Sequence, residues 1–296
     1  MRRWLNASVP AASRVADHSS LWLPGALAWM VTVGWIALVV GVARPPSDAD
    51  LTFFGARIFT SGAWPWNGVA LVVAVALLVA GAVALASVAE AALLRGTAAA
   101  DASLGAVLAI AAVCVLPFLL ACVIFGVALA SVAPGEFNAP DATGNPLLRA
   151  TISLAPLVVA VLAAAVIGAA IHAAATRTLP VAGGTLRALG SAPSTLRRAG
   201  AAGVAQALAL LVARLGFLVV AAVLLRVLWA PIDERLATEG IGVPAVLLLL
   251  GFVAIWLCLV LAGGALHAWG SLSWTRLLGA GREVDAAAQM ESRSRP

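Results

Sequence analysis

The sequence predicts an all-α, polytopic membrane protein whose six transmembrane helices form three helical hairpins, with both termini cytoplasmic. Hydrophobic residues make up 63% of the chain and charged residues only 10%. A soluble domain has roughly 45–50% apolar and about 25% charged residues. Apolar runs long enough to cross a bilayer core, about 20 residues each, occur six times. Arginines gather at alternate ends of these runs, which gives the predicted topology.

The six predicted spans are joined by loops, the longest of which has about 25 residues. The first run is longer and starts later than the apolar core of a signal peptide, so it is expected to be a retained helix. Pro117 lies in the middle of the third run and is expected to kink it. The predicted spans are residues 21–43, 69–94, 103–132, 151–175, 201–229 and 243–269, forming a transmembrane domain over 21–270 between cytoplasmic tails at 1–20 and 271–296.

The distribution of arginine sets the predicted orientation. The chain has a net charge of +5 and no lysine. The N-terminus, residues 95–102, residues 177–200 and the C-terminus together hold about twelve arginines, and the opposite loops hold about five. The positive-inside rule places the richer side in the cytoplasm. Anionic lipid explains the basic balance, so no nucleic-acid partner is expected. The abundance of Ala, Gly and Arg indicates a bacterial plasma membrane protein from a GC-rich genome.

Four ionisable residues fall within or beside the predicted spans and form a candidate intramembrane polar cluster: Glu90, His172, Arg214 and His267. Placing an arginine at a bilayer centre costs at least about 2.5–3.5 kcal/mol, so Arg214 is expected to face the bundle interior or a wet cavity. An ion pair between Glu90 and Arg214 would remove the largest desolvation cost. We therefore expect the four side chains to meet in one layer.

Three readings of this cluster stay open. It is a satisfied structural cluster that fixes helix packing, or part of a substrate or proton path, or a metal site in which Glu90, His172 and His267 are ligands. These three residues also belong to a weak threefold repeat, formed by residues 84–96, 167–180 and 262–276. Each follows a run of small residues and precedes an arginine by five to nine positions. Small residues let membrane helices approach closely.

Catalytic signatures are absent from the sequence. Without lysine there is neither a phosphate-binding GxxxxGK[ST] loop nor a Schiff-base lysine, and HExxH, GxSxG and CxxCH are not found. Cys114, Cys122 and Cys258 lie in apolar runs and give no disulfide framework. The sequence therefore predicts no enzyme activity and no cofactor.

The segment TRTLPVAGGTLRALGSAPSTLRRAG, residues 176–200, carries a regularly spaced amphipathic turn and an arginine pair ahead of the fifth span. In this it resembles uncharacterised six-helix bacterial membrane proteins, including the membrane-anchor region of some glycerophosphodiester phosphodiesterases. The resemblance implies a six-helix architecture and a supporting membrane role. No phosphodiesterase domain is present, so it implies no activity for this chain.

These observations favour a non-catalytic integral membrane protein that acts as a structural or partner-binding component. Its expected partners are the lipid bilayer and either a second copy of itself or another membrane protein. The alternative is a transporter or channel that uses the polar layer around Arg214. A membrane enzyme is the third reading.

Overall fold

The computed structural model describes residues 2–43, 50, 62–63, 66–95, 103–137, 146–238 and 240–293. These residues are almost entirely helical and include no strand. Six helical segments among them are long and apolar enough to cross a membrane, which confirms that part of the prediction. The elements are α1 (Arg2–Asp17), η1 (Ser19–Leu21), α2 (Trp22–Trp29), η2 (Met30–Gly34), α3 (Trp35–Val42), α5 (Trp66–Arg95), α6 (Leu104–Phe137), α7 (Pro146–Ser153), α8 (Ala155–Ala182), α9 (Thr185–Thr238) and α10 (Val243–Arg293).

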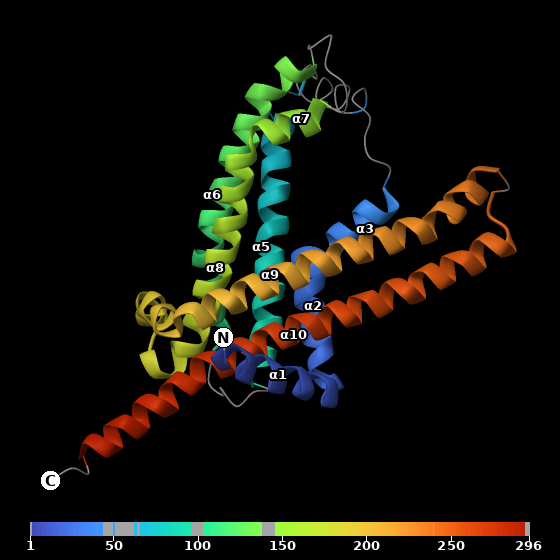
Figure 1. The fold of residues 1–296 in the computed structure, drawn as a ribbon. Helices are drawn as coiled ribbons and strands as arrows, with labels where there is room; N and C mark the ends of the chain where they lie inside the picture. Colours follow the sequence, from blue (N-terminus) through green and yellow to red (C-terminus); the bar gives the residue numbers. More distant parts are fainter. Residues whose placement is uncertain are drawn as a thin grey trace.

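The first span is bent. A π-helical turn, η2, interrupts it between α2 and α3, and α3 runs in a different direction from α2 (Figure 1). Thr32 in this turn donates its hydroxyl to the carbonyl oxygens of Ala28, at 2.7 Å, and Trp29, at 3.2 Å. A hydroxyl that bonds back to the preceding turn bends a helix, which accounts for the change of direction. By contrast, α6 continues as one helix across Pro117.

The polar connection before the fifth span is helical, and the description of it as a loop is wrong. α8 ends at Gly183, whose φ of 68° is the left-handed conformation that commonly closes a helix. Residues 185–199 then form the first part of α9, which is joined to the apolar part at Gly200, where φ is 56° and the backbone is not helical. The buried residues of this first part are spaced as one helical face: Ala188, Ala192, Thr195 and Ala199.

Both predicted tails are helical where the structure describes them. In α1, the residues Ala11 and Val15 are buried against α10. α10 itself continues well past residue 270, and Trp274 and Leu277, which the sequence analysis placed in the tail, belong to the main buried core. Apolar residues at helical spacing explain both outcomes, because an amphipathic helix is stabilised by burying its apolar face.

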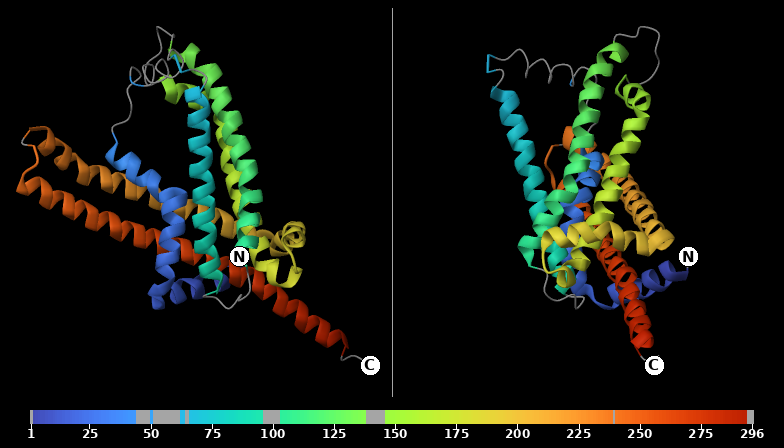
Figure 2. Two further views of the ribbon diagram at one scale, coloured as in Figure 1. Left: turned by 180° about the vertical axis from the view of Figure 1, so that it is seen from behind. Right: turned by 90° about the vertical axis from the view of Figure 1, so that its left-hand side faces the viewer.

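The helices pack tightly at one end of the molecule and separate toward the other. The packed end, called the arginine-rich end here, is formed by α1, the end of α5 with Arg95, the end of α8 with Arg177 and the start of α9 with Arg187. The last part of α10 projects past this end toward the C-terminus (Figure 1). From the arginine-rich end, α5, α6 and α8 run in one direction, while α9 and α10 run side by side in another, with α3 against α9 and α2 against α10. Figure 2 shows α5 also diverging from α6 and α8.

Burial follows this arrangement. The largest buried cluster joins Ala91 and Leu94 of α5 to residues of α6, α8, α9 and α10 at the arginine-rich end. The six consecutive residues 73–78 of α5 are all exposed. Six residues turn more than once around a helix, so this part of α5 is exposed on every face.

Glycines set the closest helix contacts. α2 crosses α10 where Gly25 meets Gly264, and a Cβ added at Gly264 would lie 2.5 Å from the Trp22 carbonyl oxygen and from the Ala26 nitrogen. The ring of Trp29, which is only 2% exposed, fills the space left by the missing side chain of Gly263. The backbones can therefore approach here in the way expected for small residues in membrane helices.

The α2–α10 crossing gives a test of this packing. Gly264→Ala should lower the thermal unfolding midpoint in detergent, because the added methyl meets backbone atoms that cannot move aside, at a cost of about 1–3 kcal/mol. Gly251→Ala on the same helix is the control. Nothing lies within 4 Å of its added Cβ, so it should be neutral or stabilising. Equal midpoints for the two variants would contradict the crossing.

Candidate functional site

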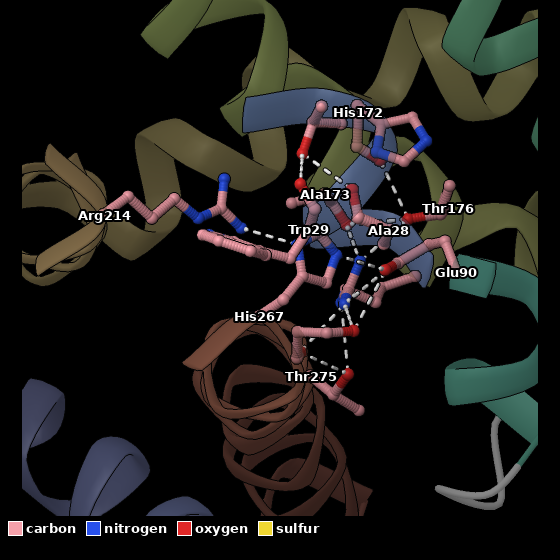
Figure 3. Close-up of polar contacts among 12 residues, drawn as sticks. Ala28, Trp29, Glu90, His172, Ala173, Thr176, Arg214, His267 and Thr275 are labelled. Carbon is pink, nitrogen blue, oxygen red and sulfur yellow. Dashed lines mark hydrogen bonds and ion pairs between the residues drawn. The ribbon is translucent and has the colours of Figure 1, made fainter. Parts of the chain in front are cut away.

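A buried ion pair joins α5 and α8 at the arginine-rich end. Arg177 Nη2 lies 2.9 Å from Glu90 Oε1, and the two side chains are 4% and 9% exposed. Ser271 of α10 donates its hydroxyl to the same carboxylate oxygen at 3.0 Å. Three helices that are far apart in the sequence therefore converge on the carboxylate of Glu90. Figure 3 shows Glu90 among the polar side chains that surround it.

The rest of the Arg177 guanidinium is also hydrogen-bonded. Its Nη2 donates to the carbonyl oxygen of Ser271 at 2.8 Å, and its Nε donates to the hydroxyl of Thr275 at 3.1 Å. Its Nη1 donates to the Thr176 hydroxyl at 2.9 Å and to the Ala173 carbonyl oxygen at 3.2 Å. Every guanidinium nitrogen has an acceptor, which is the condition under which a buried arginine is tolerated.

The expected pairing of Glu90 with Arg214 is wrong, because Arg177 occupies that position. Arg177 appeared in the sequence only as an arginine at the boundary of a span. It lies one turn beyond His172, so its side chain can extend back along α8 into the bundle. The signal that could have found it is the threefold repeat. The structure brings together the three repeat segments, which contribute Glu90, Arg177 and Ser271 with Thr275.

Arg214 lies beside this cluster rather than in it. Its Nη2 is 3.4 Å from Nδ1 of His267, and its Nε is buried without a hydrogen-bond partner. His267 Nε2 lies 3.9 Å from Glu90 Oε2. His267 thus stands between the second arginine and the carboxylate (Figure 3), and three of the four candidate residues form one chain of contacts.

His172 is the fourth candidate residue. In Figure 3 its ring points away from Arg214, and its Nε2 is buried without a hydrogen-bond partner. Its carbonyl oxygen accepts a hydrogen bond from Thr176 at 2.8 Å. Within the described part of the chain, no three His, Cys, Asp or Glu side chains are grouped so that they could hold a metal ion.

A second polar contact holds α1 to the bundle. Ser8 donates its hydroxyl to the side-chain oxygen of Gln206 at 3.1 Å, and Gln206 is fully buried. The indole nitrogen of Trp269 donates to the carbonyl oxygen of Ser8 at 3.0 Å. Sequence reasoning missed these residues because each is uncharged and none belongs to a recognisable motif.

An apolar hollow of about 430 Å³ lies between α3, α9 and α10, toward the end opposite the cluster. No ionisable side chain lines it, so it offers no chemistry of its own. Its lining residues are Leu38, Val39, Val42, Ala43, Trp229 and Phe252.

Comparison of the chain with protein-family models, with curated proteins and with solved structures found no match in any of the three.

The ion pair predicts a large effect for a small substitution. Glu90→Gln should lower the free energy of unfolding by about 3–5 kcal/mol, because it leaves the guanidinium of Arg177 buried without a countercharge. The matched control is Glu136→Gln, which breaks a pair with Arg149 whose side chains are 29% and 23% exposed. That change should cost about 0–1 kcal/mol.

A double substitution of Glu90 and Arg177 tests whether the two charges stabilise the fold as a pair. Glu90→Leu with Arg177→Met should be more stable than either single variant, because an apolar pair replaces a buried ion pair at little cost. Unfolding in detergent, followed by tryptophan fluorescence, gives all four values of the cycle. Additive losses in the double variant would show that the pair does not act as one unit.

Proposed function

We propose that this chain is a non-catalytic component of a bacterial plasma membrane that acts by joining a partner within the bilayer. The observation that carries the proposal is the contrast between its two ends. The polar cluster around Glu90 and Arg177 is satisfied by its own neighbours, while residues 73–78 of α5 are exposed on every face. This stretch contains Ala74 and Ala76, small residues of the kind that let helices approach one another closely within a membrane.

The described segments outside the candidate spans also support a non-catalytic membrane component, because they are single helices, helix ends and short connections. They comprise α1, α7, the start of α5, the ends of α6 and α10, and short connecting residues. The resemblance of residues 176–200 to the membrane-anchor region of some glycerophosphodiester phosphodiesterases also fits a supporting role. The partner is a second copy of the chain or another membrane protein.

The mass of the extracted protein, together with crosslinking, tests whether the chain has a partner. Native mass spectrometry of protein extracted in mild detergent, together with crosslinking in intact membranes, should yield a defined oligomer or a stoichiometric membrane-protein partner. A cysteine at Leu78, which is 73% exposed on α5, should crosslink to that partner. A cysteine at Ser194, exposed in the first part of α9, is the control. A strict monomer by both methods would count against the proposal.

We also propose that the spans form three hairpins with both termini in the cytoplasm. The common end of the two termini in Figure 1 and the excess of arginine at that end support this topology. In a variant without native cysteines, a cysteine at Ile241, which is 86% exposed, should react with a membrane-impermeant maleimide on intact cells. A cysteine at Ser194 should react only after the cells are opened. The reverse pattern would overturn the orientation.

A transporter or channel is the second candidate function. Its supporting observation is Arg214, an arginine within a span whose Nε has no partner. A transport path requires water or solute to reach this residue. Reaction of Arg214→Cys with a water-soluble maleimide, in the same cysteine-free background, would favour transport, and protection would favour the structural role.

A further inference from the structure

The guanidinium of Arg214 is poorly satisfied compared with that of Arg177. A guanidinium carries five N–H donors and no acceptor. The hydrogen bond of Arg214 is to His267 Nδ1, at the long distance of 3.4 Å, and its Nε is buried with no partner. A cation in an apolar span that lacks acceptors is costly, and such residues commonly mark a binding site.

The charges around Arg214 do not cancel. Arg can only donate, so Nδ1 of His267 must be the acceptor in their contact, and the ring is then the neutral tautomer with its proton on Nε2, toward Glu90. Glu90 is the one acid in the six predicted spans, and Arg177 already pairs with it. Taken together, Arg177, Arg214 and Glu90 therefore carry one uncompensated positive charge.

Arg214 is also less enclosed than Arg177. Its side chain is partly exposed, whereas Arg177 is enclosed by α5, α8 and α10. At Gly270 of α10 an added Cβ would lie 3.7 Å from Nη2 of Arg214 and 2.8 Å from the side chain of Leu210, so α10 brings no side chain to the guanidinium at this position, and Leu210 packs against the glycine. Figure 3 shows Arg214 reaching the cluster from a different side than the groups that hold Arg177.

We propose that Arg214 binds a phosphate-type anion, which neutralises the remaining charge and supplies the missing acceptors. The planar guanidinium matches phosphate oxygens in a two-pronged geometry, and such charge-assisted bonds are strong in a dry environment. The anion is either the phosphate of a phospholipid headgroup or free phosphate. The site goes beyond the proposed function, because it would exist whether or not the chain acts through a partner.

Phosphatidylglycerol and inorganic phosphate, tested separately, show whether the bound anion is a phospholipid headgroup or free phosphate. Phosphatidylglycerol added to delipidated protein in detergent should give a bound adduct in native mass spectrometry and raise the unfolding temperature. Diacylglycerol, which lacks phosphate, should do neither. If inorganic phosphate alone raises the unfolding temperature as much, the ligand is free phosphate. In Arg214→Met the adduct should fall at least tenfold, while Arg226→Met, on the same helix, should bind like the wild type.

The stability of Arg214→Met in lipid-free detergent decides the case independently. If the guanidinium lacks acceptors, this variant should unfold at the same or a higher temperature than the wild type, and the order should reverse when phosphatidylglycerol is present. A variant that fails to fold, or is less stable without lipid, would show that Arg214 is satisfied within the protein and would overturn the proposal. Equal lipid binding by variant and wild type, or equal binding of diacylglycerol, would also overturn it.

Discussion

The structure depends on the ion pair between Glu90 and Arg177. A lone charge in this position would be too costly to keep, and the two together are kept only because Ser271, Thr275 and Thr176 complete their hydrogen bonds. The acceptors come from α8 and α10, so the guanidinium is satisfied only when these helices and α5 are in place. The pair thus fixes the relative position of three helices at the arginine-rich end, where the apolar core also lies.

Glycine packing also holds the helices together, but it contributes close backbone contact rather than orientation. The contact of Gly25 with Gly264 brings two backbones together through short-range van der Waals forces, which are not directional. The ion pair, with its hydrogen bonds, has strict geometry and sets which faces meet. Farther from the arginine-rich end neither device holds α5, and its residues 73–78 are exposed. α5 is therefore fixed at one end and faces lipid or partners along residues 73–78.

The sequence predicted the six apolar helices well, because length and composition alone decide whether a segment can cross a bilayer. The sequence-based prediction was wrong where a helix carries many polar residues and buries only a narrow face. Residues 185–199 look like a loop by composition, although the buried positions Ala188, Ala192 and Ala199 fall on one helical face. Small residues give a weak hydrophobic signal, so this stripe was hidden among serines and arginines.

The candidate site was predicted in part. Glu90, Arg214 and His267 do lie in contact, since ionisable groups in an apolar span must find polar neighbours. The partner of Glu90 was assigned wrongly, because the preference for the arginine within a span ignored how far a boundary arginine can reach. Which of two cations meets a carboxylate depends on helix rotation and tilt, and a single sequence does not contain them.

The attachment of α1 has a consequence for the order in which the protein is made. Ser8 contacts Gln206 and Trp269, which follow it by 198 and 261 residues. At about 5–20 residues per second, the ribosome takes roughly 13–52 s to cover the longer of these separations. α1 therefore leaves the ribosome well before the spans that hold it, and its contacts with Gln206 and Trp269 form only after these spans are made.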